Sequence, residues 1–393
     1  MFSRGKFAPN LSEPPVIVKS NPVVCQFSEY FLDFKDSLIE NLLLVCNAII
    51  ISRSTNLSVM KDYLPQLLEN DRTFSCSHYK RLIRFFNISE SANHKLIDCI
   101  LGIIYKTLSA SVKYLILDGT QWKRGEKCVH LLTLCIVYRG IAVPIYWNQL
   151  NKKGGHSSEE DRQKLFTEAC ERYQLCGKIL LADREFIGEK WLSFLVSKKI
   201  DFIIRMSKTC YKKPISESLG FVHSKLEKMV MKSKKTKKSV LKQFQIKENT
   251  YSVVIVKNDK NDPLEPLVYF ISTLQNKTEI VDGYRIRWQI EICFKHLKSN
   301  GFNIEDPNFT KDYKICLMVA LVVMAYVLSI QHGLENKIEK KKIYKNKPSR
   351  LAISYFRQGL SIIKAKIWSL KRFISVLNNI FKNADQGKLL YVQ

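Results

Sequence analysis

Apolar residues recur every three or four positions near both ends of the chain, a spacing that predicts helices. The pattern covers residues 30–110 and returns in residues 311–380, where the polar segment "KIEKKKIYKNKPSR" interrupts it. Ser77 is the predicted N-cap of a basic helix, "SHYKRLIRFFN", in the first of these regions. A helix-turn-helix variant that binds DNA and a plain helical bundle both fit that region.

The middle of the chain consists of short apolar runs that predict strands. The first predicted strand, "VKYLILD", ends at Asp118, and a later one, "KILLAD", ends at Asp183. Arg139-Gly140 predicts a hairpin turn between them, and helical segments separate the later strands. Antiparallel strands followed by strands that alternate with helices indicate a mixed α/β fold.

Residues 207–265 are basic and lower in complexity, and they predict a small β-rich insertion with a basic hairpin tip. A dense run of lysines lies in this insertion: Lys232, Lys234, Lys235, Lys237 and Lys238. A solvated loop explains such a run as simply as a DNA contact does.

The segment "GYRIRWQIEICFKHLKSNG", residues 283–301, is predicted to be a helix with two different faces. Its apolar face consists of Ile286, Ile290, Cys293, Phe294 and Leu297. Its polar face consists of Tyr284, Arg287, Trp288, Glu291, Lys295 and Lys298. Glu291 is the only acid in the segment. It is therefore either a partner in i,i+4 ion pairs on a solvated face or a residue with a chemical role.

The charge of the whole chain favours a polyanionic partner. The sequence has 63 Lys and Arg residues against 36 Asp and Glu residues, a net charge of +27 spread along the chain. Such an excess is typical of proteins that bind nucleic acid. The odd number of 11 cysteines and the length of the chain favour a reducing cytoplasm over a disulfide framework. The cysteines include no Cys-x-x-Cys pair, and no cluster of zinc ligands is visible.

Two further patterns bear on membranes. The N-terminal residues contain no apolar run, so no signal peptide is expected. Residues 315–330 are strongly apolar, but 16 residues are fewer than the roughly 20 that span a bilayer. We therefore predict a buried helix and no membrane partner.

Three acids from separate predicted elements are candidate metal ligands: Asp118, Asp183 and Glu291. Ligands in α/β folds gather at the carboxyl ends of strands, where the two aspartates are predicted to lie, although each Asp could instead cap a turn. Hard divalent cations prefer such oxygen clusters, and a pair of them can drive phosphodiester cleavage or strand transfer. A basic chain with one small acidic cluster suits an enzyme that cuts DNA.

The motifs "LILDGTQWKRG", "LLADREFIG" and "YRIRWQIEICFKHLKSNGFNIED", in this order, resemble the DDE transposases of bacterial insertion sequences. The third resembles the Tyr-Arg-Glu-Lys signature of the IS-four family, at Tyr284, Arg287, Glu291 and Lys298. The resemblance covers about residues 110–306.

The resemblance implies a ribonuclease H-like catalytic core interrupted by a β-rich insertion, between N- and C-terminal helical regions. It implies two Mg²⁺ ions, for which Mn²⁺ can substitute, bound by Asp118, Asp183 and Glu291. Tyr284, Arg287 and Lys298 would then contact DNA phosphates. The implied partners are the terminal inverted repeats of the element and target double-stranded DNA, bound by a homodimer in a synaptic complex. The implied location is the bacterial cytoplasm, at the nucleoid. Further DNA contacts are predicted for Lys295, Lys234, Lys235, Lys237 and Lys238.

One departure from the family leaves the reaction path open. Members that pass through a DNA hairpin hold a flipped base with aromatic residues, including a Trp in the insertion, but no Trp occurs between Trp191 and Trp288. Trp122 follows the first Asp closely and is interpreted as a packing residue. Other aromatic residues are candidates for stacking on the base: Tyr211, Phe221, Phe244 and Tyr251.

The predicted division has four parts. Residues 1–110 form a helical DNA-binding domain, 111–206 and 266–306 the catalytic domain, 207–265 the insertion, and 307–393 a helical region for dimerisation. Two alternatives to an active transposase are a DNA-binding relic without activity and a ribonuclease H-like nuclease without strand transfer.

Overall fold

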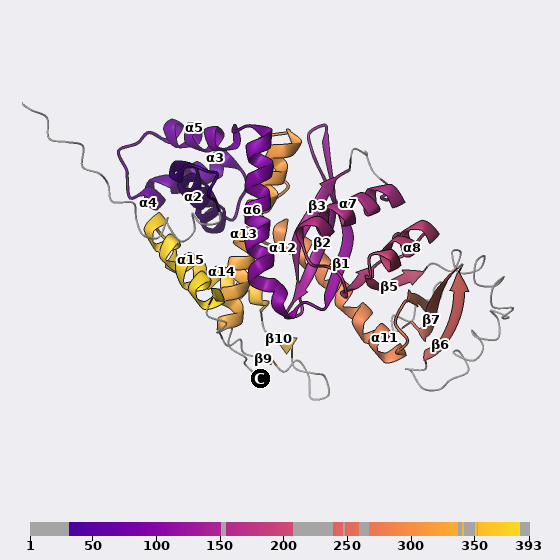
Figure 1. The fold of residues 1–393 in the computed structure, drawn as a ribbon. Coiled ribbons are helices and arrows are strands. Elements are labelled where there is room, and N and C mark those ends of the chain that lie inside the picture. Colours follow the sequence, from indigo (N-terminus) through magenta and orange to yellow (C-terminus); the bar gives the residue numbers. More distant parts are fainter. Residues whose placement is uncertain are drawn as a thin grey trace, which may run out of the picture.

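The computed structural model describes residues 31–150, 155–206, 239–246, 248–258, 267–336, 340–341, 350–351 and 353–385. Helices from both ends of the chain form one side of the molecule, and a twisted sheet extends from them to the opposite side (Figure 1). This agrees with the predicted order of helical, mixed and helical regions.

The N-terminal helices form as the periodicity predicted. They are α2 (Asp36–Ser52), α3 (Leu57–Met60), α4 (Leu64–Leu68), α5 (Ser75–Phe86) and α6 (Glu90–Leu108), with short 3-10 turns at Lys61–Tyr63 and Ser109–Ser111. The predicted N-cap at Ser77 is wrong. The backbone N–H of Ser77 already donates to the carbonyl of Phe74, at 2.9 Å, so Ser77 lies inside the first turn.

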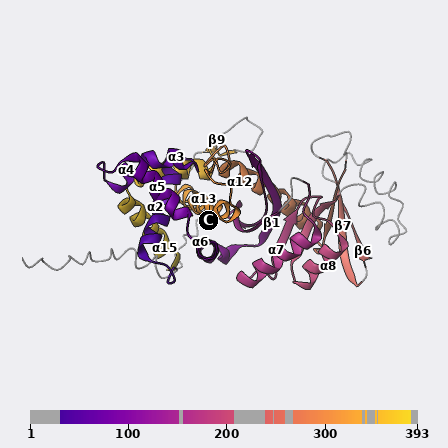
Figure 2. The same ribbon diagram turned by 90° about the horizontal axis from the view of Figure 1, so that it is seen from above.

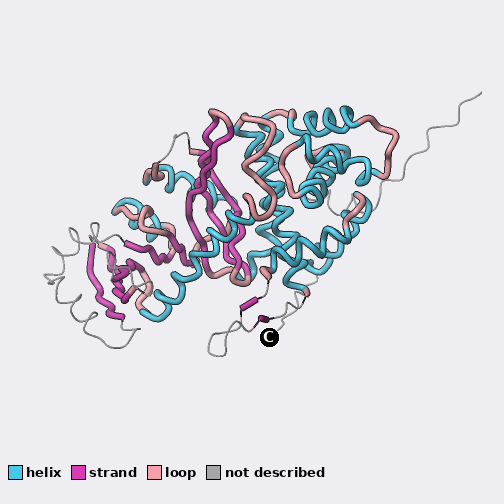
Figure 3. The backbone as a smooth tube through the Cα atoms, turned by 180° about the vertical axis from the view of Figure 1, so that it is seen from behind, coloured by secondary structure: helices cyan, strands magenta, loops and turns pink. Residues whose placement is uncertain are grey.

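An eight-stranded sheet has the order β3-β2-β1-β4-β5-β8-β7-β6. Its strands are β1 (Tyr114–Arg124), β2 (Lys127–Tyr138), β3 (Ile141–Gln149), β4 (Ile179–Ala182), β5 (Asp201–Met206), β6 (Ser239–Ile246), β7 (Asn249–Lys257) and β8 (Leu267–Ser272). The ladders from β1 through β4 to β5 are parallel, and the other neighbours are antiparallel. The strands cross the molecule as a continuous layer in Figure 3.

The predicted hairpin turn is confirmed at Arg139 and Gly140, which have φ values of 48° and 77° and join β2 to β3. Two residues with positive φ match the right-handed twist of the flanking strands. The predicted strands in the insertion are also present. β6 and β7 pair with each other, and β7 pairs with β8, so the described part of the insertion extends the central sheet. Lys234, Lys235, Lys237 and Lys238 lie outside the described residues.

The predicted end of the first strand at Asp118 is wrong, because β1 continues to Arg124. The polar residues after Asp118 conceal this continuation in the sequence, but they pair with β2 out to Lys127. Pairing with β2 satisfies their backbone N–H and C=O groups, whatever their side chains are. By contrast, β4 ends at Ala182, so the prediction that Asp183 follows a buried strand is confirmed.

Helices cover both faces of the sheet. Tyr146 on β3 donates a hydrogen bond to Glu168 of α7 (Glu159–Arg172), at 3.1 Å. Its neighbour Trp147 lines a small cavity with Phe294 of α12 (Gln289–Leu297). Successive residues of a strand point to opposite faces, so α7 and α12 lie on opposite sides. Figure 2 shows α7 and α8 (Glu189–Ser197) together on one of these sides.

The segment 283–301 is not the single helix that its periodicity predicts. It is divided among α11 (Lys277–Arg285), a 3-10 turn at Ile286–Trp288 and α12, which ends at Leu297. The predicted apolar face is confirmed at Ile290, Cys293 and Leu297, which are buried, whereas Ile286 and Phe294 are partly buried. The prediction was therefore wrong about the continuity and the length of the helix, and right about these three buried positions.

The C-terminal helices pack against the N-terminal ones. They are α13 (Asp312–Glu335), α14 (Tyr355–Lys366) and α15 (Leu370–Asp385), with a two-stranded ladder of β9 (Lys340–Lys341) and β10 (Arg350–Leu351). Helix α13 contacts α14, α6 and α2, so the two ends of the chain share a core. It is long and apolar enough to cross a membrane, but 83% of its apolar window is buried. This agrees with the predicted buried helix.

Candidate active site

The parallel ladder between β1 and β4 brings two of the three predicted acids together. Leu117 pairs with Ala182 as the last step of that ladder, so Asp118 and Asp183 each follow it by one residue. Each carboxylate accepts a hydrogen bond from the backbone N–H of the next residue, Gly119 or Arg184, at 2.8 Å in both cases. The ladder and the two local hydrogen bonds therefore position both side chains.

Arg287 joins Asp118 to the third acid. Its Nη1 lies 3.3 Å from Asp118 Oδ2, and its Nη2 lies 2.6 Å from Glu291 Oε1. The exposed fractions of the three side chains are only 11% for Arg287, 20% for Asp118 and 29% for Glu291. The ion pair between residues i and i+4 is therefore present, as the plainer interpretation of Glu291 expected. It is not on a solvated face, because it lies against β1 and includes Asp118.

Tyr284 completes the arrangement at Asp183. Its hydroxyl donates to Asp183 Oδ1 at 3.3 Å, and its ring packs on Phe270 with centroids 4.6 Å apart. Burial raises the pKa of the Tyr284 phenol, and the negative charge of Asp183 raises it further. The phenol is thus held in its protonated form, as a hydrogen-bond donor to the carboxylate. The guanidinium of Arg287 lies 6.0 Å from the centre of the Tyr284 ring.

The spacing of Tyr284, Arg287 and Glu291 places their side chains on one side of the helical segment. Residues three and four positions apart are neighbours on a helix surface. The 3-10 turn at Ile286–Trp288 contains Arg287, and Glu291 follows in the first turn of α12. The interruption of the helix therefore leaves these side chains on the side that faces Asp118 and Asp183.

Two effects oppose each other at Asp118. Burial raises the pKa of Asp118 to about 6, the positive charge of Arg287 opposes this rise, and the carboxylates of Glu185 and Asp183 add to it. A cation bound beside Asp118 would favour its ionised form and lower its pKa.

The donor set suits Mg²⁺ or Mn²⁺, because carboxylate oxygens are the ligands that hard cations prefer. Within the residues that the structure describes, however, no group of three or more His, Cys, Asp or Glu side chains is arranged to hold a metal ion. Arg287 takes one oxygen from each of Asp118 and Glu291, and Tyr284 takes one from Asp183. The residue types fit the metals, whereas the side-chain arrangement presents its oxygens to Arg287 and Tyr284.

Lys298 and Lys295 differ in their surroundings. Lys298 Nζ donates to the carbonyl of Gln121 on β1 at 2.9 Å and lies 3.0 Å from Glu305. It thereby joins the end of α12 to the strand that carries Asp118. Lys295 is exposed and lies over the ring of Trp288, 5.7 Å from its centroid. Their predicted DNA contacts stay predictions.

The aromatic residues that were candidates for stacking on a base differ in their surroundings. Tyr251 is buried and packs on Phe202 with centroids 5.9 Å apart, which leaves its ring no exposed face for a base. Tyr211 and Phe221 lie outside the described residues, and the side chain of Phe244 is not described. Trp122 is 7% exposed and lines the small cavity beneath α12, so its interpretation as a packing residue is confirmed.

Two residues near the site, Glu185 and His156, were not predicted from the sequence. Glu185 lies two residues after Asp183 and contributes to the field at Asp118, and its Oε2 is 2.6 Å from His156 Nδ1. The backbone carbonyl of Glu185 accepts a hydrogen bond from the buried Arg162, at 2.7 Å. The segment "DREF" contained the acid, but a loop position after a strand has no periodicity that marks it.

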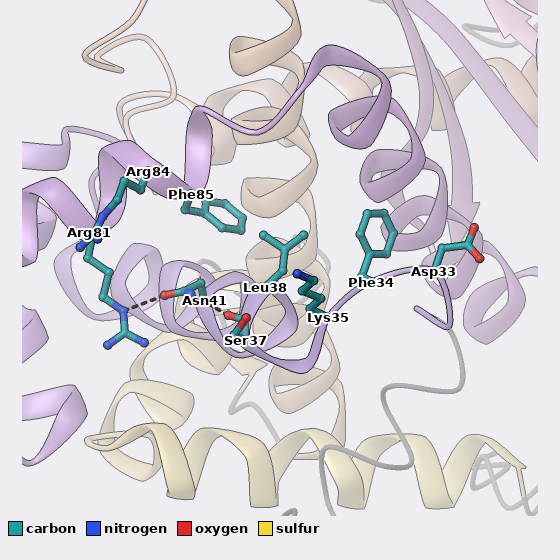
Figure 4. A pocket seen from close by; sticks show the side chains of 9 residues that line it. All are labelled: Asp33, Phe34, Lys35, Ser37, Leu38, Asn41, Arg81, Arg84 and Phe85. Carbon is teal, nitrogen blue, oxygen red and sulfur yellow. Dashed lines mark hydrogen bonds between the residues drawn. The ribbon is translucent and has the colours of Figure 1, made fainter.

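A second polar hollow lies in the N-terminal helices, between the start of α2 and the basic helix α5. Figure 4 shows Arg81 and Arg84 of α5 on one side of it. It has a volume of about 560 Å³, and Arg81 Nε donates to Asn41 at 2.7 Å across it. The lining is Asp33, Phe34, Lys35, Ser37, Leu38, Asn41, Arg81, Arg84 and Phe85.

One comparison with known proteins, a family model, agrees with the motifs. A family model described as a transposase DDE domain matches residues 113–328, a range that includes Asp118, Asp183 and Glu291. A search of curated proteins finds no match. Among solved structures, the chain is similar to the cryo-EM structure of a piggyBac transposase synaptic complex with hairpin DNA. The identity is 12%, the coverage is 95% of this chain and 80% of that chain, and the TM-score is 0.46.

Proposed function

Because the chain belongs to the family of transposase DDE domains, we propose that it cuts DNA at the inverted-repeat ends of an insertion sequence and joins those ends to target DNA. One observation carries the proposal. Acids from three separate elements, Asp118, Asp183 and Glu291, meet beside the buried Arg287 and the phenol of Tyr284. The match of the motifs to the Tyr-Arg-Glu-Lys signature supports the finer assignment to the IS-four family.

The metal ligands in this proposal are the three acids. Two bound Mg²⁺ ions would activate water or a 3′-hydroxyl and stabilise the leaving oxygen. The remaining residues of the site orient the reactants. Arg287 offers a planar guanidinium that matches phosphate oxygens, and Tyr284 offers a hydroxyl donor. Both lie next to the acids, so a phosphate bound by them would be close to the metal ligands.

The proposal includes a ribonuclease H-like core. What supports it is the five-strand part of the sheet, β3-β2-β1-β4-β5, in which Asp118 lies on β1 and Asp183 follows the neighbouring parallel strand β4. The strands of the insertion follow β5 in the chain and precede the helix that carries Glu291. The proposed partners are the element ends and target DNA, bound by a homodimer in the bacterial cytoplasm.

The test is divalent-metal-dependent nicking of a labelled duplex that carries the DNA flanking the reading frame. Glu291→Gln keeps the shape of the side chain and removes its charge. We expect nicking to fall by several orders of magnitude, because metal-based stabilisation of several kcal/mol is lost. Binding of the duplex, followed by gel shift, should persist. The matched control is Asp282→Asn on α11, which removes an exposed carboxylate paired with Arg285 at 3.0 Å and should nick normally.

The same assay separates the alternatives. Joining of the cut ends to a target plasmid distinguishes a transposase from a nuclease that only cleaves. Binding without nicking by the wild-type protein indicates an inactive relic. Nicking by Glu291→Gln at a rate close to that of the wild type would remove Glu291 from the metal site and contradict the three-acid proposal.

A further inference from the structure

Arg287 contacts one oxygen of each of two proposed metal ligands. Its two terminal nitrogens contact different acids, Asp118 Oδ2 at 3.3 Å and Glu291 Oε1 at 2.6 Å. These acids come from β1 and α12, which are 173 positions apart in the chain from residue 118 to residue 291. The guanidinium therefore bridges the strand acid and the helix acid directly.

The same residue is electrostatically connected to the third acid. The negative charges of Asp183, Asp118 and Glu291 all raise the pKa of Arg287, against the lowering effect of its burial. The Tyr284 ring lies 6.0 Å from the Arg287 guanidinium, and its hydroxyl lies 3.3 Å from Asp183 Oδ1. Arg287 is thus the internal counter-ion of the cluster.

Resting on the proposed function, we propose that Arg287 and the divalent cation compete for Asp118 and Glu291, so that metal binding releases the Arg287 guanidinium toward the DNA phosphate. A divalent cation bound by these carboxylates would lie close to the positively charged guanidinium that contacts the same groups, and the two like charges would repel each other. The guanidinium cannot lose its proton, so displacement is the only way for it to yield the oxygens. Once displaced, it is a buried cation that requires a new anion, and a phosphate held at the metal is the nearest candidate.

The competition makes metal binding and DNA binding cooperative. A cation that takes the acids frees Arg287 for phosphate, and a phosphate that takes Arg287 frees the acids for a cation. By linkage, each ligand must raise the affinity of the other by the same factor. Arg287 is therefore a positioning residue whose effect is measurable on binding alone, without catalysis.

The first arm of the test measures Mn²⁺ affinity by isothermal titration with DNA-free protein. Roughly pH 8 is suitable, because Asp118, with a pKa of about 6, is then ionised. Arg287→Gln removes the competing charge, so we expect Mn²⁺ to bind about 5- to 150-fold more tightly than to the wild type, the usual range of coupling between sites. Arg287→Lys keeps the charge but cannot contact both acids with a planar fork, so its Mn²⁺ affinity should lie between the two.

The matched control is Arg285→Gln, which removes an exposed arginine two residues away, paired with Asp282. It should bind Mn²⁺ as the wild type does. Thermal unfolding in EDTA, followed by circular dichroism, shows whether each variant is folded. Arg287→Gln should melt at a lower temperature than the wild type, and saturating Mn²⁺ should raise its melting temperature by more.

The second arm measures binding of a short random-sequence duplex with Ca²⁺ and with NaCl at equal ionic strength. Ca²⁺ should tighten binding by the wild type, and this enhancement should be lost in Arg287→Gln. Equal Mn²⁺ affinity of wild type and Arg287→Gln would overturn the competition and leave the proposed function intact. Absence of Mn²⁺ binding in both proteins would overturn the competition together with the proposed metal site.

Discussion

At the scale of one residue, the charge that a metal ligand requires at Asp118 conflicts with the burial of its carboxylate in the folded protein. Its carboxylate is mostly buried, and burial raises its pKa to about 6 although Arg287 lies beside it. An unperturbed aspartate has a pKa near 3.9. The folded protein therefore disfavours the charge at this position, and a metal site requires that charge. A pKa that is shifted in this way is typical of residues at functional sites rather than of residues that stabilise the fold.

This balance predicts that Asp118→Asn stabilises the protein in EDTA. Below about pH 4, Asp118 is protonated in both the folded and the unfolded chain, so it causes no penalty. Above about pH 6 it is ionised in both, and the penalty is fully present. We expect the variant to exceed the wild type in free energy of unfolding by roughly 1–3 kcal/mol at pH 8, with the difference shrinking toward pH 4. Urea unfolding across this pH range measures it.

Asp282→Asn, at an exposed position, is the control and should show no such gain. A lower stability of Asp118→Asn at pH 8 would mean that the ion pair with Arg287 outweighs the cost of burial. In either case the variant should lose metal-dependent nicking, because it lacks one of the proposed ligands.

At the scale of elements, two helices pack closely because glycines lie at the point where they cross. Helices α13 and α14 cross at Gly333 and Gly359. A Cβ on Gly333 would lie 1.9 Å from the carbonyl oxygen of Tyr355, and a Cβ on Gly359 would lie 1.7 Å from that of Ser329. Each helix thus brings its backbone to a glycine of the other. This contact supports α13, which packs in turn against α12 and β3.

Gly359→Ala should therefore separate α13 from α14. Backbone atoms cannot move aside as a flexible side chain can, so we expect a loss of about 1–3 kcal/mol, the usual cost of overpacking. Gly102→Ala in the middle of α6 is the matched control, since a Cβ there meets no atom within 4 Å. That variant should gain up to about 1 kcal/mol from helix propensity. Chemical denaturation of both variants measures the contrast, and equal effects would contradict the packing argument.

At the scale of the whole molecule, charge determines how the protein meets its partner. The net charge of +27 belongs to the entire chain, whereas the acids of the site form one small cluster. The sheet extends from the helical side through β5 to the strands of the insertion, so the helical regions and the described strands of the insertion lie at its opposite ends (Figure 1). A long duplex would be attracted along this length rather than at one point.

The charge predicts a steep salt dependence of DNA binding. The logarithm of the binding constant should fall linearly with the logarithm of salt concentration between roughly 50 and 200 mM, because each neutralised phosphate releases counterions. The combined replacement of Lys234, Lys235, Lys237 and Lys238 by Gln should reduce this slope and weaken binding without unfolding the protein. Fluorescence anisotropy at several salt concentrations provides both slopes. If the binding constant of the wild type did not change with salt, the assignment of a nucleic-acid partner would be contradicted. If the slope of the variant equalled that of the wild type, the lysine run would be interpreted as a solvated loop that does not contact DNA.

The sequence by itself determined the local features of this protein. Apolar periodicity depends on near neighbours in the chain, so it predicted the helices of residues 30–110, the strand before Asp183 and the turn at Arg139-Gly140. The residue types and spacing of Tyr284, Arg287 and Glu291 likewise identified the helical segment that carries the third proposed metal ligand. These signals are local because helix and strand periods are themselves local.

Only the tertiary structure decided how those features meet. Pairing with β2 extends β1 past Asp118, and pairing with β8 joins the insertion strands to the central sheet. The parallel register of β1 and β4 places Asp118 beside Asp183, and the 3-10 turn brings Arg287 between Asp118 and Glu291. Apart from the i,i+4 pair of Arg287 and Glu291, these contacts have no sequence period, because each depends on a partner strand or helix far away in the chain. The physical reason is that backbone pairing and ion pairing are satisfied by whatever the fold brings near, and the fold is a property of the whole chain.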